Sequence, residues 1–279
     1  MTALRWFNSF LKEYRLRIIF GLLLVTITSI SEIVNPKISG IIVDDVISEG
    51  KYSLLPKLLI ILVATTLIRT LIKYGFLMIF ETSSQGVLYK MRDHVYRKLL
   101  KQDFSFYDKN RTGDLMSRQT GDMNAIRHFI ASVIHSTYEN ALFFLIAIVM
   151  IFVVDYRLAL CMVAVMPITV WIGYKQMKSV KPAFRNIREQ FSSLNTFVQE
   201  NVSGNRVVKA FAKEDYEIEK FEKENAGYRD AELAASEIYK KYVPIFDLLA
   251  NILTVILYLV GGIMVIKKAM SLGELVQIS

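Results

Sequence analysis

Two cations inside a long apolar run are the first residues of this chain that could do chemistry. Arg69 and Lys73 lie one helical turn apart at the centre of the run 58–80, which also holds fourteen large aliphatic or phenylalanine side chains. Membrane insertion of those side chains is favourable by roughly 4 to 8 kcal/mol, and the two cations cost roughly 5 to 7 kcal/mol. Because the two contributions nearly cancel, we expect both cations to face a hydrated cavity or carboxylates instead of lipid.

Partners for these cations occur in two other apolar runs. Glu32 lies in the run 18–47, and Asp247 lies in the run 244–266 with Asn251 one turn further on. We predict that they form one polar set with Arg69 and Lys73. This set could belong to a pathway by which a solute crosses a membrane. It could equally consist of structural ion pairs, with the cations reaching toward a headgroup layer.

The polar segment 108–120 is a candidate of a different kind. Gly113 permits a sharp turn, and Asp114 could accept hydrogen bonds from the free amides at the start of a short helix. Leu115 and Met116 would give that helix an apolar edge. Because a surface segment without a partner needs no such edge, we predict a contact with another protein.

The segment 210–217 has a single aromatic residue surrounded by charge. Phe211 is followed closely by Lys213, Glu214 and Asp215. An isolated aromatic side chain of this kind suits insertion into a pocket on a partner protein. The alternative is that Phe211 packs back on its own helices.

No residues point to catalysis or to a metal. His94, His128 and His135 do not have the spacing of metal ligands, and Cys161, the single cysteine, lies in an apolar run. The sequence contains no glycine loop followed by Lys-Ser or Lys-Thr that could cradle a nucleotide phosphate. We therefore expect no catalytic residue, no metal and no bound cofactor in this chain.

The apolar runs that hold these residues predict an all-α membrane protein. Hydrophobic residues make up 53% of the 279 residues, and the mean hydropathy is +0.35, which is too apolar for an ordinary soluble domain. A sixth run begins at 272–279. Five runs are near the length of a full membrane span: 18–47, 58–80, 130–154, 157–173 and 244–266.

Basic residues alternate along the chain in a way that predicts its orientation. Nine Lys and Arg residues lie in the loop 81–129 and thirteen in the loop 174–243, against one between the third and fourth runs. By the positive-inside tendency, the amino terminus and both long loops are cytoplasmic. The net charge of +8 is then explained by basic residues that orient the spans and contact the headgroups of one leaflet. We therefore expect no nucleic-acid partner.

The two long loops are predicted to be helical. Apolar residues recur at three- and four-residue steps in both, and neither loop is rich in Gly, Pro or Ser. A helix from 157 to about 208 would be roughly 75 Å long, far more than a hydrocarbon core of about 30 Å. Pro167 and Pro182 are expected to bend this helix. The segments 108–120 and 210–217 would then lie at its far cytoplasmic tips.

The amino-terminal stretch predicts an amphipathic elbow that lies in the membrane interface, and a plain start to the first span is the alternative. Its apolar face would consist of Trp6, Phe7, Phe10, Leu11 and Tyr14.

Both tips resemble those of a known family, the six-helix exporters of the ABC superfamily, also called type I exporters or type IV ABC transporters. The first tip resembles the family's first intracellular loop and coupling helix in Phe106-Tyr107-Asp108, Thr112 to Arg118 and Gly121-Asp122. The second resembles the approach to coupling helix two in Val198 to Gly204, Val207 to Phe211 and Glu214-Asp215. The resemblance covers nearly the whole chain.

The resemblance implies a transmembrane domain, residues 1–279, that ends within span six and lacks its nucleotide-binding domain. It implies a dimer of such domains that works by alternating access in a cell membrane, here a bacterial cytoplasmic membrane, with ATP and Mg²⁺ bound in the nucleotide-binding domains. The substrate would be a hydrophobic or amphipathic drug, lipid or peptide. The residues expected to contact the ATPase domain are Thr112, Gly113, Asp114, Leu115, Met116, Ser117, Arg118, Ala210, Phe211, Lys213, Glu214 and Asp215.

Two other functions stay open at this point. A regulatory or channel-like membrane protein could use the same scaffold without pumping. A soluble helical scaffold that binds membrane surfaces is opposed by apolar runs such as Ala141 to Val154.

Overall fold

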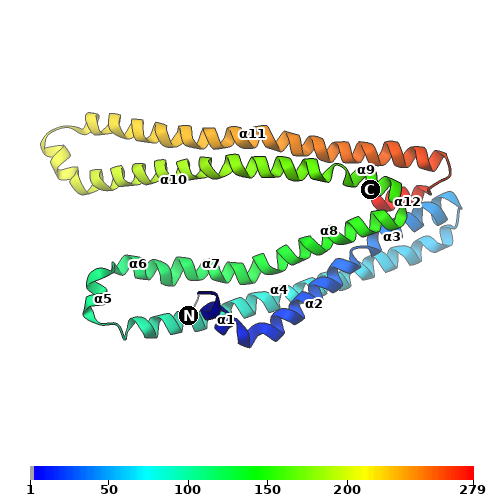
Figure 1. Cartoon of the computed structure of the whole chain (residues 1–279), viewed down its shortest axis with the longest axis horizontal. Coiled ribbons are helices and arrows are strands. Elements are labelled where there is room, and N and C mark those ends of the chain that lie inside the picture. The colour runs from blue at the N-terminus through cyan, green and yellow to red at the C-terminus, as the bar shows by residue number, and fades with distance from the viewer. Residues whose placement is uncertain (1–2) are drawn as a thin grey trace. The chain divides into compact units, whose positions relative to one another are not determined.

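The structure is a computed structural model that describes residues 3–279, and no strand occurs within that range (Figure 1). The helices are α1 (Ala3–Leu11), α2 (Arg15–Ser31), α3 (Val34–Ile41), α4 (Leu55–Leu99), α5 (Phe104–Lys109), α6 (Thr112–Ser117), α7 (Met123–His128), α8 (Ile134–Val154), α9 (Tyr156–Val163), α10 (Met166–Ala210), α11 (Glu214–Ile266) and α12 (Leu272–Ile278). Short 3₁₀ segments cover Lys12–Tyr14 and Tyr52–Leu54, and π-helical segments cover Ile42–Ser48, Arg118–Asp122 and Phe129–Val133.

Five helical stretches are long and apolar enough to cross a membrane, which confirms the predicted fold class. They are Arg5–Ser48, Tyr52–Leu99, Thr112–Val154, Tyr156–Ala210 and Glu214–Ile266. The 53 residues of α11 extend about 80 Å, and the 45 residues of α4 and of α10 extend about 68 Å each. Each therefore exceeds the hydrocarbon core more than twofold.

Proline acts differently at the two predicted bends of the fourth span. The helix is interrupted at Ala164 and Val165, and Pro167 occupies the first turn of α10, where its missing amide is tolerated. Pro182 lies inside α10, which continues on both sides of it.

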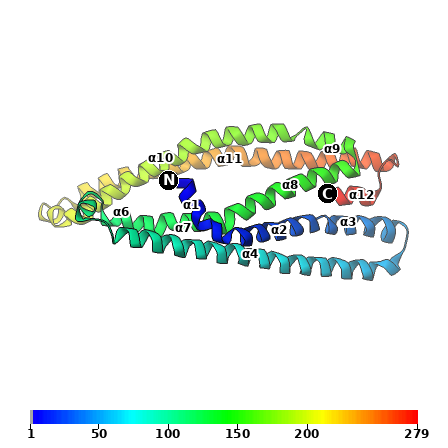
Figure 2. The ribbon, with the colours of Figure 1, turned by 60° about the horizontal axis from the view of Figure 1, so that its bottom comes forward.

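The chain divides into two compact units, of which the first comprises residues 1–156 and 264–279. In this unit α2, α4 and α8 pack side by side (Figure 2). Val25, Phe76 and Phe80 are fully buried at the centre. Gly21 permits the close approach of α2 to α4, because a Cβ atom at that position would lie 2.9 Å from Cε2 of Phe80.

The amino-terminal helix α1 packs its apolar face against the carboxyl-terminal half of α4 and against α7. Trp6, Phe7, Phe10, Leu11 and Tyr14 all contact a buried cluster of Val87, Leu88, Met91, Met123 and Ile130. A hydrogen bond from the Lys90 ammonium on α4 to the Glu13 carboxylate in the 3₁₀ segment after α1 links the two elements, and it raises the pKa of Lys90. The elbow is amphipathic as predicted, but much of its apolar face meets protein.

Several hydroxyl groups inside the spans form hydrogen bonds within their own helices. Thr26, Ser31, Thr66 and Thr70 each donate to the carbonyl oxygen four residues earlier, at 2.7 to 2.9 Å. Such bonds leave no free donor to face lipid.

The start of α12 is attached to the end of the first span. Ser271 caps α12 and pairs reciprocally with Glu274. The Asp44 carboxylate accepts hydrogen bonds from Ser271 Oγ at 2.5 Å and from the Gly273 amide at 2.7 Å. Gly40 allows this contact, because a Cβ atom there would lie 2.8 Å from the Gly273 carbonyl oxygen.

The second unit, residues 157–263, contains most of α9 to α11. Helices α10 and α11 run antiparallel along their lengths (Figure 1). Ser193 Oγ donates to Glu224 at 2.8 Å, and the rings of Phe191 and Tyr228 lie 5.6 Å apart between centroids. Ala231 and Ala235, one turn apart on α11, are buried.

Candidate functional site

Arg69 forms an ion pair with Glu32, one of the two carboxylates that the sequence offers as partners for the cations. The Arg69 Nη2 atom lies 2.5 Å from Oε1 of Glu32, which ends α2. The side chains are 27% and 34% exposed. The pair therefore links α2 to α4 and removes an isolated charge from the apolar region.

Lys73 pairs with a residue that the sequence reading did not name. Its Nζ atom lies 3.3 Å from Oε1 of Glu139 on α8. Glu139 is the single acidic residue of the predicted span 130–154. The criterion used for Glu32 and Asp247, a carboxylate inside an apolar run, would also have selected Glu139.

The predicted polar set is divided between the two units. Asp247 and Asn251 lie one turn apart on α11 and are both exposed, and among residues 3–279 Asp247 has no ion pair. In the first unit, Arg69 and Lys73 project from α4 to carboxylates of two different helices. Each cation therefore has its own carboxylate. The role of the set in a pathway stays a prediction.

His135 is a buried polar side chain beside this set. It is 7% exposed and packs against Phe76 and Phe80, with ring centroids 5.6 and 5.1 Å away. Its Nδ1 atom has no hydrogen-bond partner within the described residues. No three His, Cys, Asp or Glu side chains in the described part of the chain form a metal-ligand group.

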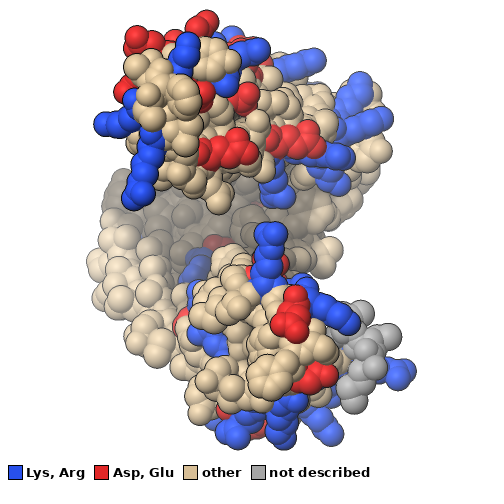
Figure 3. All heavy atoms as spheres, turned by 90° about the vertical axis from the view of Figure 1, so that its left-hand side faces the viewer, with Lys and Arg blue, Asp and Glu red and all other residues tan. Residues whose placement is uncertain are grey.

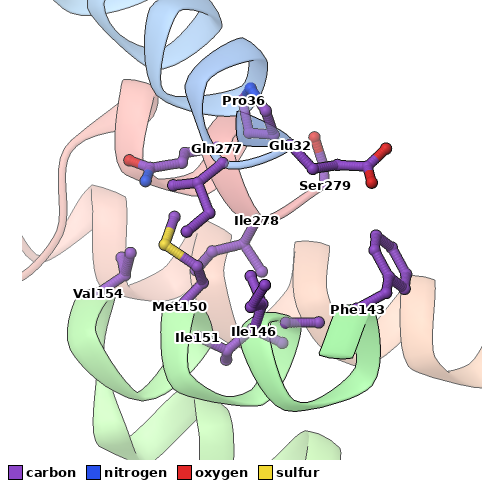
Figure 4. A pocket seen from close by; sticks show the side chains of 12 residues that line it. Glu32, Pro36, Phe143, Ile146, Met150, Ile151, Val154, Gln277, Ile278 and Ser279 are labelled. Carbon is purple, nitrogen blue, oxygen red and sulfur yellow. The ribbon is translucent and has the colours of Figure 1, made fainter. Parts of the chain in front are cut away.

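An apolar cavity of about 230 Å³ lies beside Glu32, between α2, α3, α8 and α12 (Figure 4). Figure 4 shows the side chains of Ile146, Met150 and Ile151 on α8 directed toward this space, with Glu32 along its edge. Phe143 on α8 is also part of the wall. The cavity can hold an apolar group with one polar end near the carboxylate.

The first tip is a series of short helices. Of the two apolar residues on α6, one is buried and the other is exposed. Leu115 on α6 is buried, whereas the next residue, Met116, is 60% exposed. Gly113 is helical and has open space around its Cα, so the predicted sharp turn at this residue is wrong. The Asp114 side chain makes no cap bond, because it lies inside the first turn of α6 and not at its N-cap.

Arg92 attaches the first tip to α4. Its Nε donates to the Gln119 carbonyl at 3.2 Å, and its Nη2 donates to Asn124 Oδ1 at 3.3 Å. These two bonds link the first tip to the long helix α4. Thr112, Gly113, Asp114, Ser117 and Arg118 are exposed.

The second tip is a tight turn between α10 and α11. Ala212 has φ of 46°, a left-handed conformation that ends α10, and the Lys213 amide donates to the Val208 carbonyl at 3.1 Å. Phe211 is 72% exposed. The alternative that Phe211 packs back on its helices is not supported by this exposure. Ala210, Lys213, Glu214 and Asp215 are also exposed.

Both tips have mixed charge. Figure 3 shows Lys and Arg side chains interspersed with Asp and Glu around apolar surface on each tip. A mixed charge pattern around one or two exposed apolar side chains is typical of a protein contact with a small anchored core.

Residues 18–279 match the family described as the ABC transporter transmembrane region, and the chain belongs to this family. The match covers all five long helices beyond the amino-terminal elbow.

Three relatives illustrate the range of similar proteins. An uncharacterised ABC transporter ATP-binding protein, YknU of Bacillus subtilis (strain 168), is 32% identical over 263 residues, 94% of this chain and 45% of the relative. The multidrug resistance-like ATP-binding protein MdlA of Buchnera aphidicola subsp. Baizongia pistaciae is 29% identical over 278 residues, 99% of this chain and 47% of the relative. The ATP-dependent lipid A-core flippase of Syntrophus aciditrophicus is 26% identical over 230 residues, 82% of this chain and 38% of the relative.

The chain spans about half the length of the curated relatives that it matches over nearly all of its residues. Their names describe ATP-binding proteins.

Proposed function

We propose that this chain is the substrate-translocating domain of an ATP-driven exporter. In this proposal two such domains, identical or homologous, form a dimer in a bacterial cytoplasmic membrane. The amino terminus and both tips are cytoplasmic. Nucleotide-binding domains, on the same polypeptide or a separate one, bind ATP and Mg²⁺ and dock on the tips. Closure of those domains would swing the long helices and open the pathway to the opposite side by alternating access.

The observation that carries this proposal is the exposure of Phe211 and Met116 at the ends of helices far longer than a bilayer. Exposure of a large apolar side chain to water is unfavourable, and a partner protein that covers the side chain at the helix end would remove this cost. Family membership supports the nature of that partner.

The substrate is proposed to be a hydrophobic or amphipathic drug, lipid or peptide. Support comes from the apolar cavity that has Glu32 on its edge, and from relatives named for multidrug resistance and lipid A-core flipping. A cavity of this composition favours apolar groups by desolvation and orients a polar end at one side.

The test is the variant Phe211→Ala in the full-length protein, reconstituted in vesicles. We expect ATP hydrolysis to continue while ATP-dependent movement of a fluorescent phospholipid analogue or a hydrophobic dye falls by roughly tenfold or more, since loss of an aromatic anchor costs about 2 kcal/mol. Membrane insertion should be unchanged, because the side chain lies outside the apolar spans.

Phe184→Ala is the matched control, since Phe184 is also exposed on α10 but lies about 40 Å from the tip. Normal transport by Phe211→Ala would contradict the docking role. If the wild-type protein moved neither probe with ATP and conducted ions without it, the channel-like alternative would replace the exporter.

A further inference from the structure

The register of α10 against α11 brings separate groups of lysines to one level. The position of a Cβ atom at Gly173 lies 3.9 Å from Cζ of Phe246, and Phe191 faces Tyr228 further along. Each residue forward on α10 is therefore matched by one residue backward on α11. By this register Lys178 lies level with Lys241, next to Lys240.

Five lysines form what we name the lysine belt: Lys175, Lys178, Lys181, Lys240 and Lys241. All five are exposed. Within residues 3–279, only Lys240 has a carboxylate partner, Glu237 at 3.0 Å. The belt is about 9 Å tall, as expected for six residues of helix. By the same register, no acidic residue of α10 or α11 lies between the levels of Lys175 and Lys181. Glu237 lies just beyond, level with Pro182, and Asp247 lies deeper, level with Ile172.

The belt lies where an apolar span ends. From Tyr156 to Lys175 the helical stretch covers roughly 29 Å, close to the hydrocarbon thickness of about 30 Å. Tyr174 and Tyr239 are exposed at or next to the level of the belt, and Trp171 is exposed about one turn deeper, a depth range in which amphipathic rings are favoured. The Lys175 ammonium lies 3.7 Å from the centroid of the Trp171 ring, which holds this cation at the interface.

We propose that the lysine belt is a binding surface for anionic phospholipid headgroups of the adjacent leaflet. Four ammonium groups without carboxylate partners concentrate positive charge at headgroup depth around only two helices. Phosphodiester groups offer the complementary charge and acceptor oxygens, and the apolar helix surface above the belt accommodates their acyl chains. The proposal requires membrane insertion but not transport, so its failure would leave the proposed function unaffected.

The experiment uses the full-length protein in nanodiscs of three parts phosphatidylcholine to one part phosphatidylglycerol. Mass spectrometry measures the ratio of the two lipids retained after mild detergent extraction. Wild type should enrich phosphatidylglycerol. The triple variant Lys175→Gln, Lys178→Gln, Lys241→Gln should reduce that enrichment on the order of tenfold, because each cation near a charged surface contributes separately.

Two comparison variants separate this surface from general charge effects. Replacement of the same three lysines by arginine should keep the enrichment. The variant Lys98→Gln, Lys101→Gln, Lys109→Gln removes the same charge from the first tip and should also keep it. Wild-type enrichment in the belt variant, or an equal loss in the tip variant, would overturn the proposal. If the belt variant fails to fold, the test is the lipid ratio retained by the wild type at low and at high NaCl concentration. Enrichment of phosphatidylglycerol that does not fall at high NaCl concentration would contradict headgroup binding.

Discussion

The pairing of Arg69 with Glu32 shows how single residues are accommodated in an apolar region of this protein. Each side chain alone would be a charge without a partner, and together they form a short ion pair between α2 and α4. Lys73 and Glu139 repeat the arrangement one turn along α4 toward α8. The two pairs are electrically neutral, so they join three helices without leaving net charge in the span.

Replacing one partner of an ion pair should destabilise the protein more than replacing both partners. We expect Arg69→Met to lower stability by about 1–3 kcal/mol, because Glu32 is left without its cation in a partly buried position. The double variant Arg69→Met, Glu32→Met should recover most of this loss. Thermal unfolding in detergent measures both. Equal stability of wild type and Arg69→Met would contradict the structural importance of the pair.

Helix α1 makes contacts that its amphipathic pattern alone does not specify. The pattern predicts a position in the membrane interface, which stays a prediction, and the structure adds that its aromatic residues contact α4 and α7. Tyr14 lies over Gly86, where no Cβ atom could fit, and the rings of Phe10 and His94 are 5.6 Å apart. The elbow therefore attaches to the long helix that also bears Arg92, the anchor of the first tip.

Gly86→Val should detach the elbow by displacing the Tyr14 ring. In a Trp171→Phe background, Trp6 is the single tryptophan, and we expect its fluorescence emission to shift to longer wavelength as its surroundings become more polar. Gly75→Val is the control, because Gly75 lies on the same helix with open space around its Cα. An unchanged Trp6 spectrum in Gly86→Val would show that this packing does not hold the elbow.

At the scale of the whole molecule, the distribution of basic residues predicts one orientation in the membrane. The helices extend well beyond the apolar spans, and the tips bear Met116 and Phe211. The loop that contains Lys51 joins the first two spans and should lie on the opposite side. In this loop, hydrogen bonding from Lys51 to Glu49 and Asp45 raises the pKa of Lys51.

Cysteine labelling tests this orientation directly. In a Cys161→Ser background, Met116→Cys and Phe211→Cys should react with a membrane-impermeant maleimide in inside-out vesicles only. Lys51→Cys should react in right-side-out vesicles only, because the charged reagent does not cross the bilayer. Labelling of the tip cysteines from the outer face would reverse the orientation and contradict docking on cytoplasmic ATPase domains.

The sequence by itself determined the number of spans and the excess length of their helices, and it offered Glu32 as one candidate partner for the cations of the second span. These features depend on local composition and helical period, which a single chain displays directly. Only the tertiary structure decided that Lys73 pairs with Glu139 and that the elbow packs on α4. Those outcomes depend on how helices distant in sequence rotate and pack against one another, and that relation leaves no periodic signal in the residues themselves.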